Sequence, residues 1–352
     1  MKQTNKAGLY IHIPFCIKKC SYCDFFSRGY DSATAEKYVE RLITEIAGLP
    51  ETEFDTVFIG GGTPSILPKY LLERLCRAVT ARVPNPVEFT IECNPATDLD
   101  FPFIESLGIN RISLGVQSLN DNVLKVIGRR HDSKTALGAL RAANLVFDNV
   151  SADLILGLPK QTIRDVENDI SLIKDFVTHF SCYLLKIEES TPISKTFATD
   201  DDIQADFYDA ALRHLEGNGF GRYEISNFAK PGFESKHNLK YWLGAPYIGV
   251  GAAAHSFYNG IRFENSRAIE YERINETRIE DREFEEIMLR LRLKCGIDIA
   301  AFNAKYNVDF KEKYKKQLQY LNGLLDVSKT NAAIKHDSFL LQSAIAREFL
   351  LL

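Results

Sequence analysis

The chain has 352 residues, of which 45% are hydrophobic and 26% charged, and its formal net charge is −4. This composition fits a folded globular protein and excludes a disordered, collagen-like or membrane-bundle chain, and the acidic balance excludes a global basic field for nucleic acid. The 7 cysteines are an odd number, which argues against a secreted disulfide framework. With no secretory signal and no apolar run of about 20 residues in the sequence, we expect a cytoplasmic protein.

The first part of the chain alternates short apolar runs with stretches of helical periodicity. The runs predicted as strands are residues 9–15, 56–59, 88–91, 111–116, 152–156 and 183–187. Two stretches between them each place their apolar residues on one helical face: Tyr38, Val39, Leu42, Ile43 and Ile46 in the first, and Leu71, Leu72, Leu75 and Val79 in the second. Repeated βα units predict a parallel sheet, as a barrel or an open arc of about six units. Functional residues should then follow the strands.

The pattern changes after about residue 275. A charged segment at 273–286 leads into three predicted helices, and residues 325–327 and 339–341 read as a short two-stranded wing. This order predicts a small winged-helix-like module, for which the acidic balance favours a docking or lid role over DNA binding. We therefore divide the chain into residues 1–275 and 276–352.

Three cysteines directly after the first predicted strand have the spacing of a metal centre. Cys16, Cys20 and Cys23 form C-x3-C-x2-C, and thiolates this close in sequence suit zinc or an iron–sulfur cluster. A fully ligated site would require a fourth ligand, and no fourth cysteine follows nearby. Three ligands on a four-iron cluster leave one iron open to a chelating substrate.

The loops after the next strands carry further polar and glycine-rich signals. Residues 60–64 read Gly-Gly-Gly-Thr-Pro, and consecutive glycines let the backbone approach a ligand closely. This loop fits neither a dinucleotide fingerprint nor a nucleoside triphosphate loop. Glu92 and Gln117 end the third and fourth strands, and Asp153 interrupts the apolar fifth strand. A carboxylate in such a run is costly unless it is paired or functional.

The cysteine spacing, with Tyr22 just before the third cysteine, resembles that of the radical S-adenosylmethionine (SAM) superfamily. The resemblance implies that the amino and carboxylate groups of SAM fill the open iron of a 4Fe–4S cluster. It also implies that the reduced cluster cleaves SAM to a 5′-deoxyadenosyl radical, with the electron supplied by a donor.

Seven segments between residues 8 and 242 narrow the family: GLYIHIPFC, GGGTPS, ECNP, SLGVQS, GLPKQT, YEISNFAKPG and HNLKYW. In this order they resemble the oxygen-independent coproporphyrinogen III oxidase family. The resemblance implies a partial (βα)6 radical SAM barrel with a small C-terminal winged-helix-like α+β domain. The SAM contacts that it implies are Tyr10, Tyr22, Gly61, Gly62, Thr63, Glu92, Gln117, Arg129 and Asp153.

Two branches of that family differ in function. The oxidases decarboxylate coproporphyrinogen III and carry an extra cysteine two residues after the third, behind a longer N-terminal arm. Here Phe25 takes that position and 15 residues precede Cys16. The HemW-type heme chaperone branch lacks both features and carries H-N-x-x-Y-W, which residues 237–242 match. We therefore predict a radical SAM protein that binds heme and delivers it to apoproteins. The oxidase is the alternative, and an iron–sulfur or zinc scaffold without SAM chemistry is a third hypothesis.

His237 is the predicted axial ligand of heme. Its imidazole stands beside Tyr241 and the only tryptophan of the chain, Trp242, and a nitrogen ligand with flat apolar surface suits an iron porphyrin. The alternative is a packed aromatic cluster that contains a hydrogen-bonded histidine. Reductive SAM cleavage is expected and coproporphyrinogen decarboxylation is not. The expected partners are heme, heme-accepting apoproteins, SAM and an electron donor, with a homodimer and peripheral membrane contact left open and nucleic acid excluded.

Overall fold

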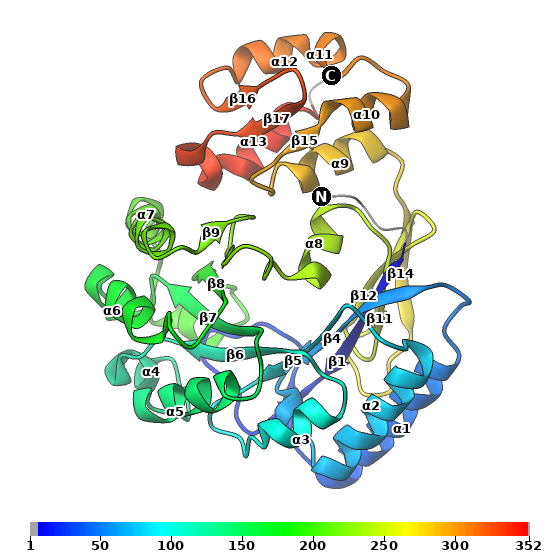
Figure 1. Ribbon diagram of the computed structural model, residues 1–352, viewed down its shortest axis with the longest axis vertical. Coiled ribbons are helices and arrows are strands. Elements are labelled where there is room, and N and C mark those ends of the chain that lie inside the picture. Colours follow the sequence, from blue (N-terminus) through cyan, green and yellow to red (C-terminus); the bar gives the residue numbers. More distant parts are fainter. Residues whose placement is uncertain (1–5, 351–352) are drawn as a thin grey trace.

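The computed structural model describes residues 6–350, and its centre is a curved sheet with helices on the outer face (Figure 1). Six strands run parallel and follow one another in space in chain order: β1 (Ala7–Ile13), β4 (Phe54–Gly61), β5 (Glu88–Cys93), β6 (Arg111–Gln117), β7 (Val150–Leu156) and β8 (His179–Leu184). The outer helices are α1 (Ser32–Ala47), α2 (Lys69–Arg82), α3 (Phe101–Ser106), α4 (Asp121–Val126), α5 (Ser133–Asn144), α6 (Ile163–Ile173) and α7 (Asp201–Gly217). This arrangement confirms the predicted partial barrel.

The outer helices bury the apolar faces that their periodicity predicts. In α1, Tyr38, Val39, Leu42 and Ile46 are buried against the sheet, and Ile43 lies at the margin. The four predicted residues of α2 are all buried. Side-chain caps fix where these helices begin, since Asp31 accepts the Thr34 N–H at 2.8 Å and Thr162 opens α6 with a capping box.

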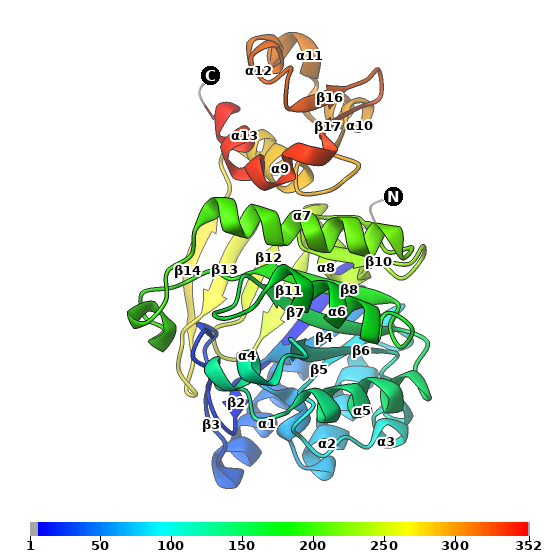
Figure 2. The ribbon, with the colours of Figure 1, turned by 90° about the vertical axis from the view of Figure 1, so that its left-hand side faces the viewer.

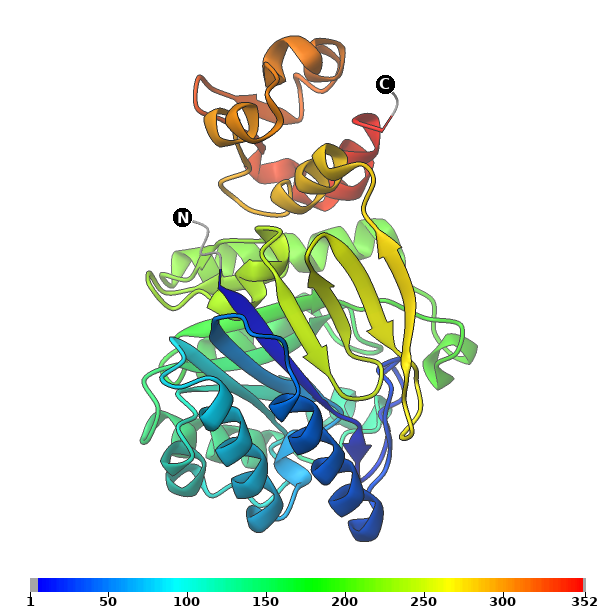
Figure 3. The ribbon, with the colours of Figure 1, turned by 90° about the vertical axis from the view of Figure 1, so that its right-hand side faces the viewer.

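Short strands extend the sheet on both sides. β11 (Tyr247–Val250) pairs in parallel with β1, and β12 (His255–Tyr258), β13 (Ile261–Asn265) and β14 (Arg273–Arg278) follow it in antiparallel order. On the far side, β10 (Asn227–Ala229) and β9 (Gly221–Arg222) continue from β8. Within residues 6–350 the sheet therefore has 12 strands, and its two edges do not pair with each other. Figure 3 shows the β11–β14 side.

Four short elements complete the barrel region. β2 (Phe15–Cys16) and β3 (Arg28–Gly29) pair across the cysteine loop, and the 3-10 turns η1 (Pro64–Ile66) and η2 (Pro192–Lys195) follow β4 and β8. The helix α8 (Lys236–Trp242) lies inside the curve of the sheet (Figure 1). Its first turn contacts Thr56, the third residue of β4, and Glu88, the first residue of β5, so α8 lies near the amino-terminal end of the parallel strands.

Two details of the predicted strands are wrong. The strand expected at 183–187 begins earlier, at His179, because His179 and Ser181 face the sheet interior and interrupt the apolar run. The second strand of the predicted wing is β17 (Asn331–Ile334) rather than residues 339–341, which lie in the 3-10 turn η3 (His336–Leu341). The first wing strand, β16 (Leu325–Val327), is confirmed and pairs with β17.

The C-terminal part forms a separate unit beyond α7 (Figure 2). Its remaining elements are α9 (Arg282–Arg290), β15 (Ile297–Asp298), α10 (Ile299–Tyr306), α11 (Phe310–Lys313), α12 (Lys315–Tyr320) and α13 (Gln342–Glu348). Phe302, Phe310 and Phe339 pack in its own hydrophobic core. The boundary expected between residues 275 and 276 falls within β14, and we propose that the division follows this strand. No helix within residues 6–350 is long and apolar enough to cross a membrane.

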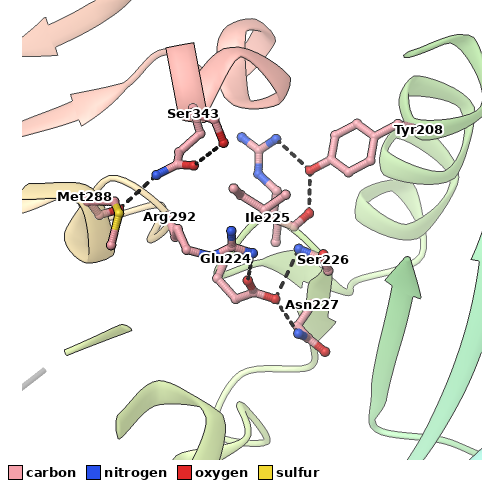
Figure 4. A network of polar contacts seen from close by, with 10 residues as sticks. Tyr208, Glu224, Ile225, Ser226, Asn227, Met288, Arg292 and Ser343 are labelled. Atoms are coloured by element: carbon pink, nitrogen blue, oxygen red, sulfur yellow. Dashed lines mark hydrogen bonds and ion pairs between the residues drawn. The ribbon is translucent and has the colours of Figure 1, made fainter. Parts of the chain in front are cut away.

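An ion pair between a half-buried arginine and a buried carboxylate joins the C-terminal unit to the sheet (Figure 4). Glu224 is fully buried, and its carboxylate lies 3.7 Å from the Arg292 guanidinium, which follows α9. Ser226 N–H and the Asn227 side chain also donate to Glu224. The Arg292 guanidinium stacks 4.2 Å from the ring centre of Trp242, at the end of α8. Arg292 therefore connects α8, the β9–β10 edge and the C-terminal unit.

Candidate functional site

The three cysteines lie in one loop at the carboxyl end of β1. Their thiols are free and partly exposed. The loop is held from both sides, since the Cys16 sulfur lies 3.5 Å from the Thr63 hydroxyl and Arg129 donates to the Cys20 sulfur at 3.6 Å. Backbone contacts support it as well, because Ser21 N–H donates to the Ile127 carbonyl.

The donor set suits an iron–sulfur cluster better than a single metal ion. Among residues 6–350, no three His, Cys, Asp or Glu side chains are close enough together to hold one ion. A 4Fe–4S cluster takes each thiolate on a different iron, so its ligands need not meet at one point. Burial, together with the nearby Cys20 and Cys16 thiols, raises the pKa of Cys23 to about 11. A cationic cluster core would reverse that effect by favouring the thiolates.

The glycine loop after β4 packs directly on the cysteine-bearing segment. Gly61 has φ +113°, and a Cβ there would lie 2.6 Å from the His12 ring. A Cβ on Gly62 would lie 2.8 Å from the Phe15 carbonyl oxygen, and Gly62 N–H donates to the Ile13 carbonyl at 2.8 Å. Both glycines are therefore required by the fold itself. Substituting either would disturb the loop whether or not a ligand binds there.

Two carboxyl groups lie on the interior face, Glu92 next to the last residue of β5 and Asp153 in the middle of β7. Glu92 accepts the Gly61 N–H at 2.9 Å, and Asp153 accepts the Ser113 hydroxyl at 3.0 Å. Burial, with the negative charge of Asp153 as a second cause, raises the pKa of Glu92 to about 8. Burial also raises the pKa of Asp153. The interior therefore holds two acids that retain protons more strongly than exposed carboxyl groups do.

Three of the remaining predicted SAM contacts gather at the carboxyl end of β6. A Cβ on Gly115 would lie 3.0 Å from the Gln117 amide and 3.4 Å from the Arg129 guanidinium. Both side chains therefore pack over Gly115. Arg129 also donates to the Gly115 carbonyl. Tyr22 interacts with both Cys20 and Arg129, and burial raises its pKa. Tyr10 lies further inside, with its hydroxyl 3.0 Å from His12 Nδ1.

A small cleft opens at this edge of the sheet. Its lining combines a cysteine with polar and cationic side chains: Cys20, Thr63, Asn94, Thr97, Arg129 and Arg130. These residues come from loops after β1, β4, β5 and β6. The convergence agrees with the expectation that functional residues follow parallel strands.

His237, the predicted heme ligand, does not lie near the cysteine loop. It is fully buried at the start of α8, at the opposite end of the strands. Its Nδ1 lies 3.0 Å from the Thr56 hydroxyl and its Nε2 lies 2.8 Å from the Tyr241 hydroxyl. Burial lowers the pKa of His237 to about 3, so the imidazole is neutral. In this structure both ring nitrogens have partners, and the ring is part of an aromatic cluster with Phe58 and Tyr241.

The polar network at this amino-terminal end was not predicted from the sequence. The carboxylate of Glu88, the first residue of β5, accepts hydrogen bonds from Ser235 and from the Lys236 and His237 N–H groups. His179 links Ser151, at 2.7 Å, to the Tyr223 hydroxyl, at 2.8 Å. The only signal for it in the sequence is the presence of polar residues inside predicted apolar strands, of which Asp153 was the one predicted to have a role.

The comparisons with known proteins agree with this geometry. Residues 10–173 match the radical SAM superfamily, and residues 279–334 match the HemN C-terminal domain. Coproporphyrinogen III oxidase (HemN) from Escherichia coli, described as a radical SAM enzyme, superposes with a TM-score of 0.83 at 20% identity. The match covers 98% of this chain and 90% of that one. At this identity, the superposition establishes a shared fold.

Sequence relatives define the family more narrowly. A Lactococcus lactis protein named heme chaperone HemW is 36% identical over 335 residues, which cover 89% of this chain and 88% of the relative. Its Bacillus subtilis namesake is 33% identical over 374 residues, covering 97% and 98%. The chain therefore belongs to the radical SAM superfamily and, within it, to the HemW family. Membership of this superfamily implies a 4Fe–4S cluster and SAM.

The raised pKa of Glu92 predicts a pH-dependent stability difference between the protein and its Glu92→Gln variant. An unfolded glutamate ionises near pH 4.5, whereas Glu92 in the fold ionises near pH 8. Between these pH values the unfolded wild type has released a proton that the folded wild type still holds, so raising the pH lowers the stability of the wild type. The variant has no ionisable group at this position, so its stability does not change for this reason. The variant should therefore gain roughly 1–4 kcal/mol over the wild type between pH 4.5 and 8. Urea unfolding at both pH values measures this, with the exposed Glu36→Gln as control, and parallel profiles for all three proteins would contradict it.

Proposed function

We propose that this protein is a heme chaperone that uses a SAM-binding 4Fe–4S cluster. Cys16, Cys20 and Cys23 would hold the cluster, and the glycine loop with Glu92, Gln117 and Arg129 would bind SAM. Tyr10, Tyr22, Thr63 and Asp153 complete the proposed SAM contacts. The observation that carries the proposal is the meeting of the cysteine loop, the glycine loop and Glu92 at one end of the sheet. A bound cluster would supply an electron to SAM at its open iron.

The heme part of the proposal rests on the family. Relatives that match nearly the whole chain are named heme chaperones. The exposed Phe25 stands where the oxidases carry a further cysteine, which favours the chaperone over the oxidase. We infer a cytoplasmic protein that passes heme to apoproteins and receives its electron from a separate donor. Dimerisation and membrane contact remain predictions.

His237 is proposed as the heme ligand in a rearranged state. Its neutral imidazole is the form that binds iron. Ligation requires that Nε2 leave the Tyr241 hydroxyl and that α8 expose the ring, because the histidine is fully buried. Heme binding through His237 would therefore be coupled to movement of α8.

The cluster assignment predicts the effect of single cysteine substitutions. Cys16→Ala, Cys20→Ala and Cys23→Ala should each abolish the brown chromophore and SAM cleavage after anaerobic reconstitution, because each removes one iron ligand. Cys76→Ala is the matched control, since Cys76 is buried in α2 away from this loop. Iron and sulfide contents measure the outcome. A triple variant that retains the wild-type iron and sulfide would refute the assignment.

The choice between chaperone and oxidase is decided by two assays on one reconstituted sample. We expect stoichiometric heme binding followed by transfer to an apoprotein, measured as a change in the heme absorption spectrum. With coproporphyrinogen III, SAM and reductant we expect no decarboxylated product, measured by chromatography. SAM-dependent formation of a vinyl product at a steady rate would instead establish the oxidase.

The proposed role of His237 predicts opposite effects for two variants. His237→Ala should lose heme affinity, whereas Tyr241→Phe should bind heme a few-fold tighter, because the phenylalanine keeps the packing but removes the hydroxyl that occupies Nε2. Heme titration and melting temperature are measured on the same samples. If His237→Ala melts earlier with unchanged heme affinity, and Tyr241→Phe binds heme as the wild type does, the histidine is only structural.

A further inference from the structure

Arg111 is a buried cation on the interior face of the sheet without a direct partner. It is the first residue of β6 and only 1% exposed. Every second residue of β6 after Arg111 packs in the core under the outer helices: Ile112, Leu114 and Val116. Because successive strand residues face opposite sides, the Arg111 side chain faces the interior.

No hydrogen bond or ion pair to the Arg111 guanidinium is formed within residues 6–350, and its Nε is completely buried without a partner. The two acids whose pKa the Arg111 charge lowers accept hydrogen bonds from other donors. Asp153 accepts hydroxyl groups of Ser113, Ser151 and Ser181, and Glu92 accepts the Gly61 N–H. A guanidinium nitrogen that is buried without a partner is costly because it has lost its hydration. A carboxylate ligand would restore two charge-assisted hydrogen bonds in a fork geometry.

Arg111 lies near the amino-terminal end, where α8 closes the interior. Its positive charge affects Glu92, Asp153, His179, Tyr223 and His237, which surround it from four strand or loop elements and from α8. Gln117 and Arg129, two of the proposed SAM contacts, lie at the other end of β6, and a seven-residue strand separates its ends by about 20 Å. Arg111 therefore lies at the opposite end of β6 from these two residues.

We propose that Arg111 binds a carboxylate of the ligand that enters the interior, and that this group is a propionate of heme. The inference rests on the proposed heme function and deepens it. Heme bound at the amino-terminal end would place its iron toward His237 and a propionate toward Arg111. Movement of α8 would open both residues to the ligand, since the helix covers this end of the strands.

Heme dimethyl ester provides the test, because it keeps the iron porphyrin but lacks the two negative charges. We expect the wild-type protein to bind heme about tenfold more tightly than the ester, the size of one charge-assisted contact. Arg111→Met should lower the heme affinity to that of the ester. Arg222→Met is the matched control, since Arg222 is equally buried but already bonds Tyr208 and the His336 carbonyl. This control should keep the tenfold preference.

Each remaining outcome supports or overturns the proposal. A folded Arg111→Met that keeps the preference for heme overturns it, and so does a wild-type protein that binds both ligands equally. If Arg111→Met does not fold, Arg111→Lys keeps the charge without the fork and should show a reduced preference, and an undiminished one overturns the proposal. Loss of SAM affinity in Arg111→Met with an unchanged heme preference assigns the carboxylate to SAM instead. A wild-type protein that binds neither porphyrin refutes the proposed function itself.

Discussion

The common direction of the strands is the constraint on which the candidate site depends. β1 lies between β4 and β11, and all three run in parallel, so the loops that follow the six βα strands emerge at one edge. Residues far apart in sequence meet there for that reason alone. Cys16 contacts Thr63 across 47 positions, and Arg129 reaches Cys20 across 109. The site is thus assembled by the sheet rather than by any single loop.

The other end of the interior depends on one buried carboxylate. Glu88 accepts hydrogen bonds from Ser235 Oγ at 3.2 Å, Lys236 N–H at 2.7 Å and His237 N–H at 2.9 Å. These bonds satisfy the free N–H groups at the start of α8 and favour the negative charge there. The end of the same helix presents Trp242 to Arg292. A displacement of α8 would therefore disturb the junction with the C-terminal unit, which offers a physical link between ligand entry and domain position.

Local patterns predicted much of the fold and the cysteine end of the site. The strand runs, the buried faces of α1 and α2 and the glycine loop all follow from short-range periodicity and spacing. The strands β9 to β14 were missed because they are short, partly polar and placed by pairing with a sheet that the sequence does not show directly. The position of His237 was missed because it depends on Glu88, 149 residues earlier. Arg111 gave no signal, since a lone arginine at the start of a strand is usually exposed.

We propose that SAM binds the open iron of a cluster held by the cysteine loop. Electron–nuclear double resonance on the reduced, reconstituted protein tests it directly, with SAM isotopically labelled at its amino nitrogen and carboxylate oxygens. We predict magnetic coupling between the cluster and both labels, because the open iron would bind both groups. A cluster that forms fully but shows no coupling to either label would contradict the account.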